Sequence, residues 1–166
     1  MIPVYVGIGS NIEPEQQIRS GLAALQRQFG PLIVSTIYSN AAIGFTGADF
    51  LNGVVGFSTD LSVYAVASGL RDIEAAHRHF DDPRLLGSRA LDLDLLLYGN
   101  HVVNEAALQL PRAEITRYAF VLKPLAEIAG DRRHPLLDAT FAELWAIFDQ
   151  QREKLTPVML TNLFAK

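Results

Sequence analysis

The sequence predicts an α+β protein with a split βαβ, or ferredoxin-like, core. Three observations lead to this fold class. The expected elements follow one another as strand, helix, strand, strand, helix and strand, with further elements after them. The chain of 166 residues is long enough for one domain with a substantial core. No internal repeat and no convincing linker divides it. We therefore expect one domain over residues 1–166, with its core over about 1–130 and a C-terminal helix and tail over 131–166.

The first strand and helix have clear boundaries. The segment Ile2–Ile8 is short, apolar and rich in β-branched side chains, so it is expected to form a strand. The turn Gly9-Ser10-Asn11 ends this strand. Pro14 suits the first turn of a helix, and Gly30-Pro31 stops it. The apolar stripe of this helix consists of Ile18, Leu22, Leu25 and Phe29. The turn between strand and helix allows an anion site, but helix capping is the favoured interpretation.

Two more strands are expected before the second helix. Residues Leu32–Ser39 alternate and are β-branched, Asn40–Asp49 form a loop of small residues, and Phe50–Ser58 read as a strand. Gly53 and Gly56 inside this last strand indicate a close approach of neighbouring groups to the backbone.

The second helix begins near Asp60-Leu61-Ser62 and is amphipathic. Its apolar face carries Val63, Val66, Leu70 and Ile73. Polar side chains lie on or beside the opposite face in its last turns: Arg71, Glu74, His77 and Arg78. A charged loop with Pro and Gly follows over His79–Ser88.

The next strand carries a pair of carboxylates. Alternation places Asp92 and Asp94 on one face and Leu91, Leu93 and Leu95 on the other, which can pack on a core. Two adjacent carboxylates repel each other unless a cation lies between them, and Mg²⁺ is often held by carboxylates and substrate phosphates. Arg89 is placed to hold phosphate oxygens. The alternative is an edge strand with both Asp side chains in water, although Asp is disfavoured in strands.

The last third of the chain is less regular. We expect a turn at Gly99-Asn100, a short strand at His101–Val103 and a short helix near Tyr118–Leu122, which Pro124 breaks or follows with a new turn. Residues Thr140–Glu143 form a capping box for a final helix.

That final helix has an apolar stripe, and the pattern fades beyond it. The stripe consists of Phe141, Leu144, Trp145 and Phe148, with Trp145 expected in the core. From Gln151 onward, the tail is expected to pack on the domain or against a second chain.

Composition excludes several classes of protein. The net charge of −4 argues against a general nucleic-acid surface. The absence of Cys excludes disulfides, thiolate metal sites and Cys nucleophiles. The N-terminus lacks the pattern of a secretory signal, and no apolar run reaches the length of a membrane span. We therefore expect a soluble cytoplasmic protein that binds neither nucleic acid nor membrane.

The carboxylate strand also carries a family resemblance. Arg-Ala-Leu-Asp-Leu-Asp-Leu-Leu-Leu-Tyr-Gly-Asn, over residues 89–100, resembles the signature of the hydroxymethyl-dihydropterin pyrophosphokinases of folate biosynthesis. That signature reads roughly Gly-Pro-Arg-Thr-Leu-Asp-Leu-Asp-Ile-Leu-Leu-Tyr, and the chain follows the family from about Tyr5 to Leu125. The resemblance implies a three-layer α/β/α sandwich with a mainly antiparallel sheet. It also implies Mg²⁺-dependent transfer of pyrophosphate from ATP to 6-hydroxymethyl-7,8-dihydropterin, with AMP as leaving group.

The resemblance assigns site residues. Arg89, Asp92 and Asp94 are catalytic, with two Mg²⁺ ions on the two Asp side chains. The pterin site corresponds to Asn40, Ala41, Ile43, Phe50, Asn52 and Phe120, because a flat heterocycle needs aromatic faces and groups that bond its edge. The nucleotide site corresponds to Arg71, Glu74, Arg89, Arg112 and Arg117. The partners are then the two small substrates, and the chain is a monomer or a homodimer.

The chain departs from the family mainly on the nucleotide side. Positions that usually carry two Arg, a Trp and a Pro hold His79, Asp81, Leu86 and Ser88, and a usual His is Arg112. Where the family usually has an Arg, this chain has Tyr118, and where the family has a Thr-Pro-Pro segment, it has Asn40-Ala41-Ala42. Asp81 would repel a polyphosphate, for which nearby Arg side chains compensate: Arg78, Arg84, Arg112 and Arg117. The alternatives are a non-catalytic pterin-binding module, a kinase of a modified pterin, or another Mg²⁺-dependent transferase.

Overall fold

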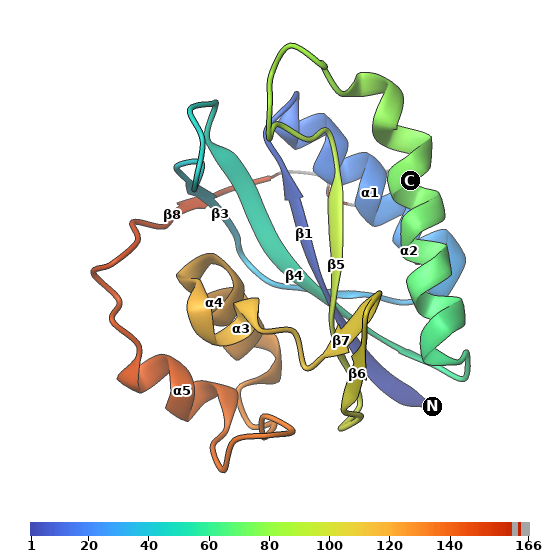
Figure 1. Cartoon of the computed structure of the whole chain (residues 1–166), viewed down its shortest axis with the longest axis vertical. Helices are drawn as coiled ribbons and strands as arrows, with labels where there is room; N and C mark the ends of the chain where they lie inside the picture. Colours follow the sequence, from blue (N-terminus) through green and yellow to red (C-terminus); the bar gives the residue numbers. More distant parts are fainter. Residues whose placement is uncertain (161–162, 164–166) are drawn as a thin grey trace.

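A computed structural model, which describes residues 1–160 and 163, has one main antiparallel sheet (Figure 1). The sheet order is β5 (Asp92–Tyr98), β1 (Ile2–Ser10), β4 (Phe50–Thr59), β3 (Ile37–Asn40) and β8 (Thr156–Val158), and β2 (Ile33–Val34) also pairs with β4. A separate hairpin joins β6 (Val103–Glu105) to β7 (Leu108–Leu110). Every pairing in the two sheets is antiparallel, as predicted.

The helices cover both faces of the sheet. The elements are α1 (Pro14–Phe29), α2 (Val63–His77), the 3-10 turn Arg78–Phe80, α3 (Glu114–Arg117), α4 (Ala119–Ala129) and α5 (Phe141–Ile147). Helix α1 connects β1 to β3 across β4, and α2 connects β4 to β5 across β1. These two split βαβ units confirm the predicted ferredoxin-like core.

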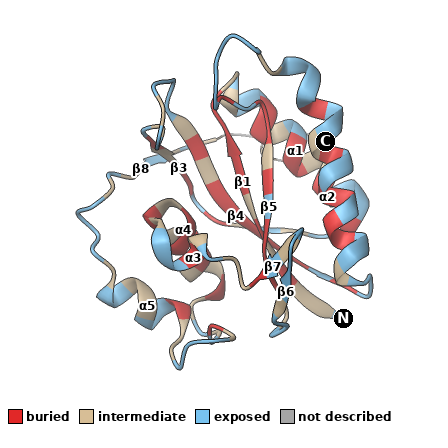
Figure 2. Ribbon diagram, viewed as in Figure 1, coloured by how far each residue is buried: buried red, intermediate tan, exposed pale blue. Residues whose placement is uncertain are grey.

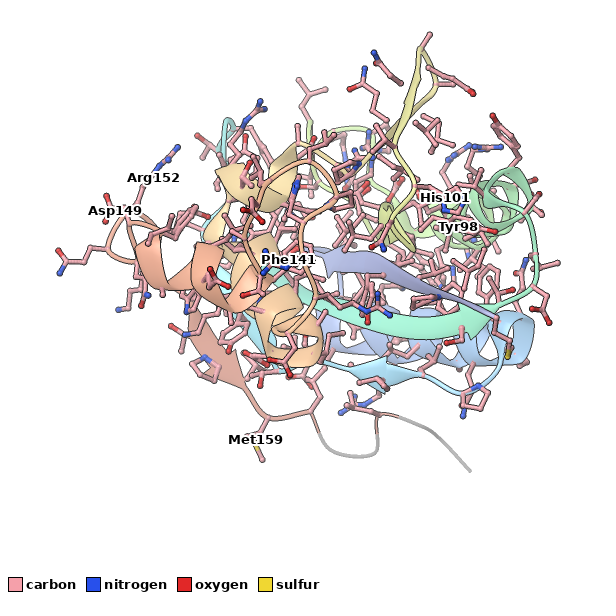
Figure 3. All side chains as sticks on the ribbon, turned by 90° about the horizontal axis from the view of Figure 1, so that it is seen from below. Tyr98, His101, Phe141, Asp149, Arg152 and Met159 are labelled. Carbon is pink, nitrogen blue, oxygen red and sulfur yellow. The ribbon has the colours of Figure 1, made fainter. Side chains whose placement is uncertain are left out.

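Two hydrophobic clusters hold the three layers together (Figure 2). One cluster packs α1 and α2 on the sheet and includes the three leucines predicted for the inner face of the carboxylate strand, Leu91, Leu93 and Leu95. The other packs α4 and Phe141 against the opposite face, where Val54, Leu96 and Leu97 contribute. Phe141 is fully buried in it, whereas Met159 near the chain end is 93% exposed (Figure 3).

Local sequence signals account for several boundaries. The Ser62 hydroxyl accepts a hydrogen bond from the Ala65 N–H (3.2 Å) at the start of α2. Thr140 accepts one from the Glu143 N–H (3.1 Å) at the start of α5 and donates to Glu143 Oε1 (3.1 Å), which confirms Thr140 as the predicted N-cap. At Gly53 the neighbouring strand approaches closely, since a Cβ atom there would lie 2.5 Å from Ile37 Cδ1 and would force that side chain to shift.

The structure corrects four local predictions outside the cavity and its loops. The strand predicted over Leu32–Ser39 is interrupted at Ser35, whose N–H and hydroxyl both bond the backbone of Val54. Pro124 lies inside α4 and does not break it, because burial of Leu122 and Leu125 stabilises the helix on either side. The strand predicted at residues 101–103 begins instead at Val103, and its partner β7 was not expected.

His77 is the fourth correction. It was expected on or beside the polar face of α2, but it is buried between α1 and α2. One ring nitrogen contacts the Ile73 carbonyl oxygen and the other contacts the Ser20 hydroxyl, each at 2.8 Å. These two hydrogen bonds offset the loss of hydration when the polar ring is buried at this helix contact.

The C-terminal tail packs on the domain through a strand. Residues Thr156–Val158 form β8, which pairs with β3 in the register Ile37↔Val158. This agrees with the first of the two expectations for the tail, while residues 161–162 and 164–166 lie outside the described part. Among the helices that the structure describes, none combines the length and the apolar character needed to cross a membrane.

Candidate active site

The two Asp side chains of β5 lie next to glycine residues of the neighbouring strand. Asp92 is paired with Gly9 of β1 and Asp94 with Gly7, so the neighbouring strand has no side chain on this face at either point. Helix α4 covers the same face of the sheet farther along. The sheet is therefore hollowed beside the carboxylates.

Asn52 of β4 lies on the other side of β1 from the carboxylates. Its partner in the sheet is Gly9, where a Cβ atom would lie only 2.6 Å from Asn52 Oδ1. Asn52 Nδ2 donates to Asn40 Oδ1 at 2.7 Å, and Asn40 Nδ2 donates to the Ala41 carbonyl oxygen at 3.2 Å. These hydrogen bonds fix the position of the Asn52 amide. Gly9 leaves space for that amide because it has no side chain.

A cavity of about 250 Å³ opens over these residues. It is lined by Asp92, Asp94, Asn40, Ile43, Phe50, Asn52 and Phe120 from the predicted set, together with Phe45, Gly87, Glu114 and backbone and apolar groups of β1 and β4. Aromatic rings and a small number of polar groups are the usual composition of a small-molecule site. The structure thus brings seven predicted site residues to one cavity.

Phe45 is a lining residue that the sequence did not single out. Its ring meets the Phe50 ring edge-to-face, with 6.1 Å between centroids. It also lies against Gly87, where a Cβ atom would be 2.8 Å from the ring. An aromatic residue in a loop of small residues was a signal that could have identified it. Phe45 joins the two loops that border the cavity.

The carboxylates concentrate negative charge at the cavity. Burial, and then the charge of Asp94, raise the pKa of Asp92 to about 6. Desolvation also raises the pKa of Asp94, although about half of its side chain (51%) remains exposed. Burial and then the charges of Asp92 and Asp94 raise the pKa of Glu74 to about 7, although Glu74 accepts a hydrogen bond from the Leu93 backbone. Because the like charges of these carboxylates contribute to the raised pKa values of Asp92 and Glu74, a cation bound between the carboxylates would relieve that repulsion.

Two predicted Arg residues supply positive charge. Arg112 Nη2 lies 3.4 Å from Asp94 Oδ1, and Arg112 Nε lies 3.3 Å from Glu114 Oε2. The charge of Arg89 partly opposes the increase in the pKa of Asp92, and its guanidinium bonds the Ser88 carbonyl oxygen at 3.0 Å. Glu114, a second carboxylate beside Arg112, was not expected in the site.

The donor set fits a magnesium site that substrate completes. Within residues 1–160 and 163, no group of three or more His, Cys, Asp or Glu side chains is arranged to hold a metal. The pair Asp92 and Asp94, with raised pKa values and a free cavity beside it, fits an ion that takes one or two carboxylates and its other ligands from phosphate and water.

Asn11 holds the loops around the cavity. Its N–H donates to the Arg89 carbonyl oxygen (3.0 Å) and its Oδ1 accepts from the Arg89 N–H (2.8 Å). Its Nδ2 donates to Ser88 Oγ and to the Ala48 carbonyl oxygen. The N-cap of α1 is Glu13, without a side-chain capping bond, so the capping interpretation of this turn is wrong.

Asp81 has a contact that the sequence did not reveal. Its Oδ1 accepts a hydrogen bond from the Ala90 N–H at 2.7 Å and so ties the 79–88 loop to the start of β5. Its charge still contributes to the raised pKa of Asp92. Asp81 therefore adds negative charge near the cavity while it anchors the loop.

Six of the predicted residues do not line the cavity. Three of them, Glu74, Arg89 and Arg112, lie beside its carboxylates. Ala41 lines a neighbouring groove with the 152–156 segment. Arg71 on α2 and Arg117 at the end of α3 are exposed, and neither lines the cavity in the described structure.

The fold and the cavity define a class: a ferredoxin-like α+β protein with a small-molecule site whose carboxylate pair comes from an edge strand. The family model of 7,8-dihydro-6-hydroxymethylpterin-pyrophosphokinase (HPPK) matches residues 5–130. The chain belongs to this enzyme family.

Relatives with assigned enzyme names support this family membership. A 2-amino-4-hydroxy-6-hydroxymethyldihydropteridine pyrophosphokinase of Pseudomonas aeruginosa is 37% identical over 136 residues, covering 80% of this chain and 83% of the relative. One of Haemophilus influenzae is 33% identical, covering 79% and 84%.

Solved structures share the fold. An HPPK-DHPS in complex with substrates has a TM-score of 0.65 at 12% identity, and the Plasmodium falciparum HPPK-DHPS has 0.67 at 11%. This chain spans 43% of each of those longer chains. At such low identity, these structures support the fold assignment only.

Proposed function

We propose that this protein transfers the pyrophosphoryl group of ATP to 6-hydroxymethyl-7,8-dihydropterin, giving AMP and the pterin diphosphate for folate biosynthesis. The observation that carries this proposal is the shared cavity. Asp92 and Asp94 line the same cavity as the aromatic and amide groups of Phe50, Asn52 and Phe120. Membership of the pyrophosphokinase family supports the assignment.

The pterin half of the cavity binds and orients the acceptor. Phe50 and Phe120 offer ring faces for a flat heterocycle, and Phe45 adds a third ring at the loops. The Asn52 amide, held by Asn40, is oriented to bond the polar edge of that heterocycle. Because the pocket is preformed, the acceptor hydroxyl is held in place before reaction.

The carboxylate half serves the donor. Asp92 and Asp94 would hold Mg²⁺, two ions in our proposal, and bound Mg²⁺ would supply positive charge to the phosphate groups. We assign the phosphate oxygens to Arg89 and Arg112, whose positive charges act on the carboxylate pair, and Glu74 is near enough to the pair for their charges to raise its pKa. Positioning and charge account for the catalysis we expect, because the transfer needs no covalent intermediate with the protein. The cytoplasmic location and the state of monomer or homodimer stay predictions from the sequence.

The test is to mix protein, ATP, Mg²⁺ and hydroxymethyl-dihydropterin and to measure AMP. We expect AMP only when both pterin and Mg²⁺ are present. If no AMP forms while calorimetry still detects bound pterin, the chain is a pterin-binding module and the proposal fails. If a different acceptor alone gives AMP, the acceptor assignment fails.

Phe120→Ala is expected to weaken pterin binding by on the order of 1–3 kcal/mol, because it removes a ring face from the cavity. The affinity for ATP should change much less. Calorimetry with each ligand separately measures both effects. Equal losses for the two ligands would show that Phe120 supports the fold and not the pterin site.

Arg89→Ala is expected to slow pyrophosphoryl transfer by on the order of a hundredfold or more, because it removes positive charge from the reacting phosphates. The pterin affinity should stay close to that of the wild type. Rapid-quench measurement of a single turnover separates transfer from product release. A single-turnover rate equal to that of the wild type would contradict the role given to Arg89.

A further inference from the structure

Arg112 is anchored by its backbone beside two carboxylates that line the cavity, Asp94 and Glu114. It lies between β7 and α3, and its N–H donates to the Leu96 carbonyl oxygen of β5 at 3.1 Å. This bond fixes the Arg112 backbone beside the carboxylate strand, while the side chain is 38% exposed. The guanidinium therefore has a fixed base and room to move.

The bonds of the guanidinium are loose. Its distances of 3.4 Å to Asp94 and 3.3 Å to Glu114 exceed the 2.7–2.9 Å usual for a charge-assisted hydrogen bond. Arg112 Nε is also buried without a hydrogen-bond partner among the described residues. The guanidinium is thus held by charge rather than by well-formed hydrogen bonds, and a competing cation can replace it readily.

We propose that Arg112 is an exchangeable counter-ion, which neutralises Asp94 in the ligand-free protein and leaves it when a divalent cation arrives with the nucleotide. The proposal rests on the proposed function for the identity of these ligands. A guanidinium within 4 Å of Asp94 repels a cation that binds the same carboxylate. The nucleotide phosphates offer the displaced guanidinium a new partner.

This exchange couples the two ligands. A divalent cation alone must separate Arg112 from Asp94 without compensation, so it binds weakly. A cation that arrives with a nucleotide brings phosphates for Arg112, so it binds more tightly. Arg112 thereby limits the occupation of the site by free metal and favours the metal–nucleotide complex.

The test measures Mn²⁺ affinity without nucleotide, from the electron paramagnetic resonance signal of free Mn²⁺. Arg112→Gln is expected to bind Mn²⁺ on the order of tenfold more tightly than the wild type, because the competing charge is gone. Arg112→Lys keeps the charge and is expected to stay near the wild type. Arg27→Gln, which removes a charge from α1 on the other side of the sheet, is the matched control.

Two further measurements separate local competition at Asp94 from a general change in metal affinity. In an Asp94→Asn background, Arg112→Gln should bring no gain, since the carboxylate that Arg112 neutralises is absent. A non-hydrolysable ATP analogue should tighten Mn²⁺ binding less in Arg112→Gln than in the wild type. Mn²⁺ affinity that is unchanged or weaker in Arg112→Gln, or equally tighter in Arg27→Gln, would overturn the proposal.

The outcome is separate from that of the activity test. A gain in Mn²⁺ affinity without any AMP formation would reject the proposed function and keep the counter-ion role of Arg112 toward Asp94. AMP formation with unchanged Mn²⁺ affinity would support the proposed function and reject the counter-ion role of Arg112.

Discussion

Asp92→Asn and Asp94→Asn are each expected to lower the rate of AMP formation by on the order of a thousandfold or more, because each removes a ligand that brings several kcal/mol of charge stabilisation to the transition state. The fold should persist. Both side chains lie at the cavity and outside the two hydrophobic clusters. A coupled AMP assay at saturating substrates measures the rate, and circular dichroism checks the fold. A rate close to that of the wild type in either variant would remove the metal assignment.

Asp92→Asn should also stabilise the ligand-free protein. The pKa of Asp92 is about 6 in the folded state, against an ordinary value of 3.8. The ionised carboxylate therefore destabilises the folded state above about pH 6, and this cost disappears as the pH falls toward 4. After a discount for solvent screening, we expect Asp92→Asn to add on the order of 1–2 kcal/mol at pH 8.

Thermal unfolding at two pH values checks this expectation. The gain should be present at pH 8 and close to zero at pH 4, where the wild-type carboxyl is largely protonated. An equal gain at both pH values would point to packing or hydrogen bonding rather than to charge. The opposite signs for stability and activity would identify Asp92 as a residue retained for binding a cation.

Phe141→Ala is expected to lower the free energy of unfolding by about 3–5 kcal/mol, a large part of the stability of a typical domain. Phe141 is fully buried and joins α5 to the cluster between α4 and the sheet. It lies beyond residue 130, where the match to the family model ends. The prediction therefore tests whether residues 131–160 belong to the same folding unit as the rest.

Ile147→Ala is the matched control in the same helix, since Ile147 is 82% exposed. It should change stability by less than about 0.5 kcal/mol. Denaturant unfolding followed by two probes, circular dichroism and Trp145 fluorescence, measures both variants. Two separate transitions, with only the fluorescence transition shifted by Phe141→Ala, would contradict a single domain.

Most elements up to Tyr98 were predictable because they carry their own local signals; the exceptions are the break at Ser35 and the 3-10 turn Arg78–Phe80. Helix α1 has Pro14 at its start and Gly30 at its end, and α2 has the Ser62 cap. The position of the carboxylates followed from alternation alone, which placed Asp92 and Asp94 opposite the buried leucines. The family resemblance supplied the other five predicted residues that line the cavity: Asn40, Ile43, Phe50, Asn52 and Phe120.

The parts that could not be predicted depend on contacts between distant segments. Asn11 and His77 have roles set by partners far along the chain or on another helix. Asp81 is bonded by a backbone N–H nine residues later, at the end of an irregular loop that carries no periodic pattern. Pro124 is tolerated because α4 is packed on both sides of it, an example of tertiary structure overriding local propensity. Strand β8 has three residues, one of them Pro, and no periodicity, so its conformation depends on pairing with β3.

The pairing of β8 with β3 also has a consequence for synthesis on the ribosome. Its two strands are more than a hundred residues apart in the chain, so β3 emerges long before its outer partner. Until then, the outer edge of β3 offers unpaired N–H and C=O groups on which another nascent chain can add a strand. Translation that stalls before Thr156 therefore leaves a chain prone to aggregation, even though every group that lines the cavity has already been made.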